Sequence, residues 1–371
     1  MKRIYLYIVA LLVFVSCQKE PQESQPPTHL GGYVTFSTGV ETKTPMNMNM
    51  REKDFGVVAF SYTSSWEAYR SSNSPDFFHN QMVSCDQNGI CIYDIDSNNT
   101  GNQVKQWDLS KLYSFFAYYP MSNHDQISIS EESKVDVPLV KYIYPFGTPD
   151  AQGNVNITVP SNVNLVDLMT ASSTDQTGKG TGNVKFNFEH RLFCFEIIAN
   201  NYNDDVKDSN GNITESAAID IKNLKLKIEG LEYDSMVVPM TPSETITEKE
   251  KEETWTKNAP SSVTYILSDA STTATIPSFN NGGTSFSLSE NCSATKDGYL
   301  MLIPQESEIT GTFTWDNMPS GDDVTTTFTT NLDFKAGNKY SIAINFAGDA
   351  ITIAIIEEGA WLPQPVYIEF E

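Results

Sequence analysis

The sequence predicts an all-β protein with two tandem β-sandwich domains behind an N-terminal export signal. Short stretches that alternate large apolar with small polar residues recur through the chain, with turn residues between them. No stretch of helical length has a strong apolar periodicity. The 371 residues suffice for two domains of ordinary size, and a run without apolar residues at 173–182 reads as the linker between them.

The N-terminus carries a secretory signal. Lys2 and Arg3 precede an apolar run at 4–15, which Ser16 and Cys17 follow. The run is shorter than the roughly 20 residues that span a bilayer. One interpretation is an ordinary signal peptide cleaved near Ser16. We favour a lipoprotein signal, because a small residue directly before Cys17 resembles the lipobox of bacterial lipoproteins. Cys17 would then carry acyl chains that hold the protein to a membrane.

Domain limits follow from these features. We expect a signal peptide at 1–16, a lipidated tether rich in Pro, Gln and Ser at 17–32, an N-terminal β-sandwich at 33–172 and a C-terminal β-sandwich at 183–371. The polar, partly acidic run after Cys17 resembles the surface-export signal of Bacteroidetes lipoproteins. We therefore expect a lipid-anchored protein of the cell outer membrane that is exposed on the cell surface.

Strand patterns fill both domains. In the first domain they lie at 33–37, 55–62, 81–84, 89–93, 112–119, 125–129, 154–159 and 165–171. In the second they lie at 184–190, 192–199, 218–229, 299–303, 310–315, 325–332, 339–346 and 350–356. Phe186, Phe188, Leu192 and Phe195 alternate at strand spacing, interrupted near His190, and are expected to be buried in the second sandwich.

Composition and motifs exclude several classes of function. The formal net charge of −23 repels nucleic acid, which we exclude as a partner. The chain contains no Gly-rich phosphate loop, nucleophile elbow or zinc-protease helix motif. Its His residues have no metal-ligand spacing with Cys or with one another, and His190 is expected to be structural. We therefore expect no enzyme, no cofactor and no metal site.

Two cysteines flank a turn signal. Asn88 and Gly89, between Cys85 and Cys91, favour a tight hairpin turn. A disulfide between the two cysteines is possible there. With Asn-Gly at the turn centre, however, Cys91 faces Asp86, so direct pairing of the cysteines needs a longer loop. Cys194 lies in an apolar strand pattern and is expected to be a buried thiol.

An aromatic cluster lies in a stretch rich in Ser and Asn. It contains Trp66, Tyr69, Phe77 and Phe78. Exposed aromatic rings could stack on sugars, which would suit an adhesin or a glycan-binding protein. The favoured interpretation is that these rings cover one end of a sandwich.

Several short sequence blocks follow one another over nearly the whole chain. The blocks are Thr42-Lys43-Thr44, Phe55-Gly56-Val57, Phe115-Phe116-Ala117-Tyr118-Tyr119-Pro120, Asp167-Leu168-Met169, Phe186-x-Phe188-x-His190-Arg191-Leu192, Phe334-Lys335-Ala336-Gly337-Asn338-Lys339-Tyr340 and residues 353–361. In their order and spacing, these blocks together resemble the fimbrillin-like proteins of Bacteroidetes.

The resemblance implies two transthyretin-like β-sandwich domains, export as a lipoprotein and assembly into surface fimbriae with other fimbrial subunits. In the best understood members, a trypsin-like protease cuts after an Arg in the N-terminal domain. Removal of the first strand opens a groove, and a strand from another subunit fills it. An open edge supplies unpaired N–H and C=O groups for this exchange, while alternating side chains fill pockets.

Applied to this chain, the resemblance makes Arg51 the candidate cleavage site, because it follows the first strand pattern in a polar stretch. The C-terminal tail is the candidate donor strand, with Val366, Ile368 and Phe370 on one face. Arg51 can instead be an ordinary solvated side chain. The tail can instead form the last strand of the subunit's own sheet.

The leading hypothesis is therefore a structural and adhesive fimbrial subunit, assembled by β-strand exchange after proteolytic removal of the first strand and located in a surface fimbrium. The alternative is a monomeric glycan-binding or adhesin surface lipoprotein, whose partners would be host or bacterial glycans or proteins. In both hypotheses the acylated Cys17 binds outer-membrane lipid. A stalk, a tip and an anchor position all stay open.

Overall fold

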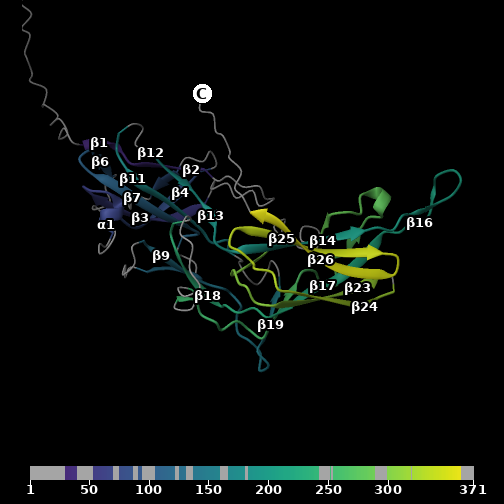
Figure 1. The fold of residues 1–371 in the computed structure, drawn as a ribbon. Helices are drawn as coiled ribbons and strands as arrows, with labels where there is room; N and C mark the ends of the chain where they lie inside the picture. Colours follow the sequence, from purple (N-terminus) through teal and green to yellow (C-terminus); the bar gives the residue numbers. More distant parts are fainter. Residues whose placement is uncertain are drawn as a thin grey trace, which may run out of the picture.

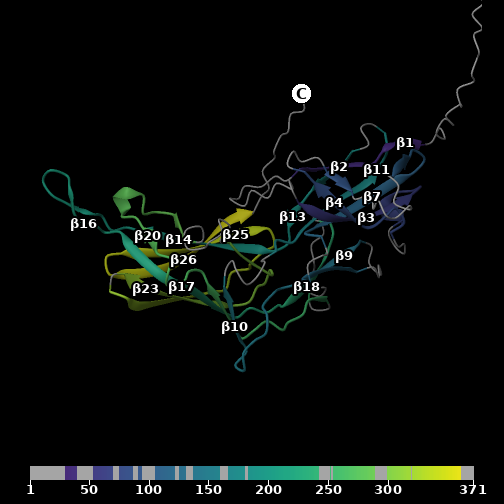
Figure 2. The same cartoon turned by 180° about the vertical axis from the view of Figure 1, so that it is seen from behind.

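The computed structural model describes residues 30–39, 53–69, 75–86, 91–93, 105–121, 125–130, 137–158, 166–179, 183–241, 251, 254–288, 299–318 and 320–360. Strands dominate these residues, so the predicted all-β class is confirmed. Figure 1 and, from behind, Figure 2 show two groups of strands. Strands β9 (Leu139–Ile143) and β18 (Ser235–Pro239) lie between the two groups.

A sheet of eight strands, here called the N-terminal sheet, holds most of the first group. Its strands in spatial order are β12 (Asn183–Asn187), β2 (Thr35–Gly39), β5 (Cys91–Tyr93), β4 (Phe78–Cys85), β3 (Asp54–Tyr62), β7 (Leu112–Tyr119), β11 (Met169–Gln176) and β13 (Glu189–His190). Only Phe188 separates β12 from β13 in the chain, although these strands end the sheet on opposite sides. The sheet therefore curls, and β12 contacts β11.

The middle strands of this sheet, β3 and β7, are buried on both faces, which explains their nearly continuous apolar sequences. On the inner face, Phe55 and Phe115 pack into a core with side chains of β2 and β12. On the outer face, Phe60 and Phe116 pack against Trp66 of the short helix α1 (Trp66–Tyr69). The three-stranded sheet β18-β9-β8, where β8 is Ile127–Ser130, contributes to the same outer cluster.

The second group is a sandwich of two sheets, here called the C-terminal sandwich. One sheet contains β10 (Asn154–Thr158), β19 (Ser262–Ile266), β17 (Ile219–Glu229), β23 (Ile309–Met318) and β24 (Asp322–Thr330), with β20 (Ala274–Ile276) beside β17. The other contains β21 (Phe286–Ser287), β14 (Phe193–Asn201), β25 (Asn338–Ala347) and β26 (Ala350–Ala360), with β22 (Leu300–Leu302) beside β14. The inner faces meet in one core, where the ring centroids of Trp315 and Phe346 lie 6.0 Å apart.

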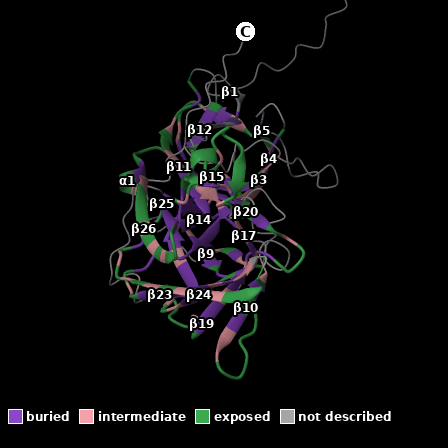
Figure 3. Cartoon of the chain, turned by 90° about the vertical axis from the view of Figure 1, so that its right-hand side faces the viewer, coloured by how far each residue is buried: buried purple, intermediate pink, exposed green. Residues whose placement is uncertain are grey.

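Burial decreases from the interior of the sandwich to its edges. Figure 3 shows β14 buried inside the molecule, whereas exposed residues mark β24 and β26. Three smaller features lie outside these sheets. They are the pair of β1 (Leu30–Tyr33) with β6 (Gln106–Asp108), the pair of β15 (Val206–Lys207) with β16 (Ile213–Glu215), and the 3-10 helix η1 (Phe279–Asn281).

Strands from the first half of the chain pair with strands from the second half. β10 pairs in parallel with β19, and β9 pairs antiparallel with β18. Both β9 and β10 fall inside the range expected for the first domain. The limits 33–172 and 183–371 stay a prediction, and the sequence pattern gave no sign of these interlocking strands.

The polar run at 173–182 is only partly a connection. β11 continues to Gln176 by pairing with β7, so the expectation of a linker is wrong for its first residues. This half of β11 is half-buried to exposed, which accounts for its polar sequence. Asp175 Oδ1 accepts hydrogen bonds from the Trp66 backbone N–H, at 2.8 Å, and from the Tyr62 hydroxyl, at 3.0 Å. The run thereby fixes the start of α1.

The burial predicted for Phe186, Phe188, Leu192 and Phe195 is confirmed. Leu192 and Phe195 lie in the cluster that includes the core of the C-terminal sandwich. The placement of Phe186 and Phe188 in the second sandwich is wrong. Both join the core inside the N-terminal sheet, because β12 pairs in parallel with β2. Alternation identifies the buried face of a strand but not the sheet to which the strand belongs.

We expect Phe188→Ala to lower the free energy of unfolding of the N-terminal sheet by about 3–5 kcal/mol, because the truncation leaves a cavity beside Phe55 and Phe186. Denaturant unfolding measures the change. The control is Lys185→Ala on the exposed face of β12, which should change the free energy by less than about 0.5 kcal/mol. An unchanged midpoint for Phe188→Ala would contradict the packing described here.

Candidate functional site

Strand β2, which corresponds to the first strand pattern of the sequence and is here called the first strand, fills a gap in the N-terminal sheet. β2 lies between β12 and β5. It pairs in parallel with β12 from Thr35↔Asn183 to Gly39↔Asn187, and antiparallel with β5 at Phe36↔Cys91. Just before it, the Val34 backbone N–H donates to the Lys105 carbonyl at 2.9 Å, and β1 pairs with β6. The segment is thus an inserted strand and not an exposed edge.

The side chains of this segment anchor it in the core. Val34 and Phe36 are 1% and 4% exposed. The Phe36 ring lies 5.8 to 5.9 Å, between centroids, from four other aromatic rings, which we call the Phe36 box. The box consists of Phe78, Tyr93, Phe115 and Phe186. Aromatic pairs of this kind contribute about 0.5–1.5 kcal/mol each beyond the area that they bury.

Removal of the first strand would therefore leave an apolar groove, here called the first-strand groove. Its floor is the Phe36 box, and its two rims are the backbone edges of β12 and β5. An uncovered apolar groove is unfavourable in water, and unpaired strand edges readily accept another strand. The arrangement can thus bind an extended segment that carries apolar side chains at alternate positions.

Polar contacts hold residues 105–108, which include β6, beside the groove. Tyr93 Oη accepts a hydrogen bond from the Lys105 backbone N–H at 2.8 Å, and Tyr113 Oη accepts one from the Asp108 backbone N–H at 2.9 Å. Burial raises the pKa of both Tyr93 and Tyr113, so both phenols stay neutral at physiological pH. Trp107 of β6 is 1% exposed and packs edge-on against Tyr113.

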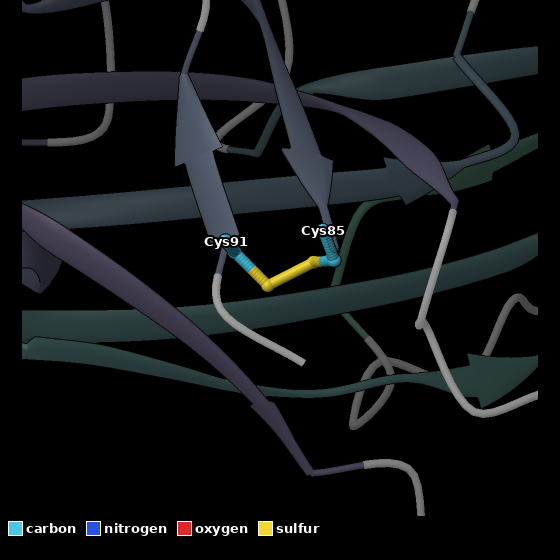
Figure 4. The surroundings of a disulfide bond; sticks show 2 residues. All are labelled: Cys85 and Cys91. Atoms are coloured by element: carbon cyan, nitrogen blue, oxygen red, sulfur yellow. A yellow bond between two sulfur atoms is a disulfide. The ribbon is translucent and has the colours of Figure 1, made fainter. Parts of the chain in front are cut away.

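A disulfide joins the two strands next to the groove. Cys85 and Cys91 are bonded with an S–S distance of 2.00 Å, and Figure 4 shows the bond bridging the ends of β4 and β5. The ladder places Cys85 directly opposite Cys91, so Cys91 does not face Asp86, as an Asn-Gly turn centre would require. In the sequence, five residues separate the two paired cysteines. Cys194 is a buried free thiol, as predicted.

The site residues predicted from the sequence lie outside the described part of the chain. Cys17, Arg51, Val366, Ile368 and Phe370 all fall there. In the sequence, Arg51 stands between the end of β2 and the start of β3, and the tail follows β26. Sequence reasoning missed the Phe36 box, because its rings come from β4, β5, β7 and β12, which only the fold brings together.

The aromatic residues of the predicted cluster divide between the two faces of the N-terminal sheet. Trp66 and Tyr69 of α1 join the outer cluster, whereas Phe77 and Phe78 join the core inside the sheet. Trp66 is 7% exposed and Phe78 is 3% exposed, so neither presents a ring face to a sugar. Tyr69 stacks on Tyr62 with centroids 5.0 Å apart, and Phe77 packs against Tyr113 at 4.7 Å. The interpretation of these rings as cover for one end of a sandwich stays a prediction.

A buried polar pair connects two passages of the chain. His190 Nδ1 lies 2.6 Å from Asp167 Oδ2, and both side chains are almost fully buried. This agrees with the structural role expected for His190. Among the described residues, no group of three or more His, Cys, Asp or Glu side chains is placed to hold a metal ion. Within the same part of the chain, no helix has the length and apolar character to cross a membrane.

The fold and the groove together define an all-β protein whose first strand completes a curled sheet. A family model described as fimbrillin-like matches residues 42–358. The chain therefore belongs to the fimbrillin-like family, as its sequence blocks indicated.

Solved structures share the fold. A fimbrial protein from Bacteroides vulgatus aligns with a TM-score of 0.56 and 16% sequence identity, over 89% of this chain and 99% of that chain. A protein described as a candidate cell adhesion protein, from Bacteroides ovatus, aligns with a TM-score of 0.51 and 13% identity, over 91% of this chain and 99% of that one. No curated protein matches the sequence.

We expect Phe36→Ala to loosen the first strand, because the truncated side chain no longer fills the Phe36 box. A loss of about 3 kcal/mol would speed amide hydrogen exchange in β2 by roughly 100-fold if β2 opens locally. Mass spectrometry of peptides from β2 measures this rate. Ile92→Ala is the matched control, since Ile92 lies on the neighbouring strand and is 67% exposed. Equal exchange in β2 of the two variants would contradict the role given to Phe36.

Proposed function

We propose that the protein is a subunit of a surface fimbria and that it assembles by exchange of its first strand. The observation that supports this most directly is the position of β2, which buries Phe36 between β12 and β5 and follows directly on the buried Val34. This strand belongs to a terminal segment that one backbone cut can detach. Membership in the fimbrillin-like family and the shared fold with a Bacteroides fimbrial protein support the same conclusion.

Cleavage after Arg51 is the proposed trigger. The cut separates residues 17–51, which contain β1 and β2, from β3 and the rest of the protein. The same piece carries the proposed lipid anchor at Cys17. A single cut thereby both frees the subunit from the outer membrane and makes the first-strand groove available to another strand.

The proposed donor is the C-terminal tail of another subunit of this kind. In the first strand, a β-branched Val34 and an aromatic Phe36 are separated by one residue. Ile368 and Phe370 repeat this pairing in the tail. We therefore place Ile368 at the position of Val34 and Phe370 in the Phe36 box. A donor that replaces β2 in this register runs parallel to β12 and antiparallel to β5, as β2 does.

The glycan-binding alternative has less support. It drew on the aromatic residues Trp66, Tyr69, Phe77 and Phe78, and the rings of Trp66 and Phe78 are buried. No other described feature favours a sugar site over strand exchange. Fimbrial assembly thus accounts for more of the structure than a monomeric lectin does.

We expect Arg51→Ala to leave the subunit bound to the membrane and monomeric, because its first strand stays covalently attached. Membrane fractionation and a sizing gel of surface material, with and without treatment by a trypsin-like protease, measure both effects. Arg70→Ala is the control for loss of an arginine elsewhere. Surface polymer whose N-terminus is still acylated Cys17 would contradict the cleavage mechanism.

We expect Phe370→Asp to stop a subunit from donating its tail, because a carboxylate in the Phe36 box has neither solvent nor a partner. Polymer length on the sizing gel should fall to monomer and short species. Tyr367→Asp places the same charge on the opposite face of the tail and should leave assembly intact. Equal polymer length for Phe370→Asp and wild type would exclude the tail as donor in this register.

A further inference from the structure

The Cys85–Cys91 disulfide lies at one rim of the first-strand groove. Cys91 is the residue of β5 that pairs with Phe36, and Tyr93 contributes a ring to the Phe36 box. β5 has 3 residues and is paired with β4 on its other side. The described chain thus holds this rim by two neighbouring strands and one covalent bond.

Departure of the first strand leaves β12 without a paired described strand and leaves β5 paired with β4 alone. β5 loses the neighbour at Phe36 and becomes the outermost strand beside the groove. Its ladder to β4, the disulfide, and the contacts of Tyr93 with Lys105 and Phe78 then hold it. A strand of 3 residues is at the short end of the lengths found in stable sheets. Without the disulfide, β5 could separate from β4 and take Tyr93 out of the box.

We propose that the Cys85–Cys91 disulfide is a positioning element for strand exchange. It keeps β5 in register while the groove is empty, so that the backbone edge of β5 and the ring of Tyr93 meet the incoming strand. This inference rests on the proposed function. The bond stays oxidised throughout and takes part in no redox step. Disulfides persist outside the cytosol, where the proposed assembly takes place.

If the disulfide only stabilised the folded protein in general, its loss would affect the uncut and the cut subunit alike. The bonded cysteines are 6 residues apart in sequence, and a bond that closes so short a loop constrains the unfolded chain only modestly. In the uncut subunit, β2 already holds β5 from the other side. Loss of the disulfide should therefore affect the uncut subunit little and the cut subunit strongly.

The test uses the full mature chain with both cysteines replaced, Cys85→Ser together with Cys91→Ser. Cys194→Ala controls for loss of a buried thiol that forms no disulfide. After cleavage by a trypsin-like protease, each chain is mixed with a fluorescent peptide of residues 361–371, and anisotropy follows its capture. We expect capture by the double variant to be at least tenfold slower than by wild type, with denaturant midpoints of the uncut chains nearly equal.

A reductant provides a second comparison that needs no variant. Treatment of cut wild-type chain before the peptide is added should slow capture. Treatment after capture should release no peptide, because the bound strand then holds β5. Equal capture rates for wild type and double variant would overturn the inference and leave the proposed function standing.

A separate measurement distinguishes failure of the inference from failure of strand exchange. If cut wild type neither captures the peptide nor polymerises, the proposed function fails. Hydrogen exchange at Ile92 and Tyr93 in the cut chains then decides whether the disulfide holds β5. Faster exchange in the double variant supports that role, and equal exchange overturns it.

Discussion

The insertion of the first strand between β12 and β5 is the contact on which the N-terminal sheet depends. β12 pairs with no described strand except β2, and β5 has β4 as its only other neighbour. Because a single residue joins β12 to β13 at the far end, β2 also closes the curled sheet. The side chain of Phe36 makes the central contact between the first strand and this sheet, because aromatic rings from four strands surround it.

The interlocking of the two strand groups limits how far a change at the groove can spread. β9 and β10 leave the N-terminal group and pair with β18 and β19, and the chain then returns to form β11. Asp167, just before β11, pairs with His190 of β13 in the buried interior. Val34 and Phe36 belong to a different buried cluster from the core of the C-terminal sandwich, so loss of β2 would uncover none of that core.

Sequence patterns predicted the local structure well and the long-range pairing poorly. The pattern at 112–119 coincides with β7, and the one at 218–229 matches β17 to within one residue, because strong apolar alternation or a continuous apolar run marks a strand directly. The same information could not place Phe186 and Phe188, since their alternation fits either sheet. It also could not give the Cys85–Cys91 register, which depends on the length of a loop. The sequence could not predict the Phe36 box either, because the members of the box are far apart in sequence.

A strand that is part of its own chain has a large advantage over any competitor. In the uncut subunit, the connection between β2 and β3 holds the first strand near its groove at a high effective concentration, so a strand from another molecule cannot compete at equal intrinsic affinity. Backbone cleavage between β2 and β3 removes that advantage without altering a single contact in the groove. The first strand then returns only by a bimolecular encounter, while its side chains bind no more tightly than a donor of the same pattern. The cut can therefore switch the preferred occupant of the groove because it changes the connectivity of the chain and leaves the recognition chemistry as it was.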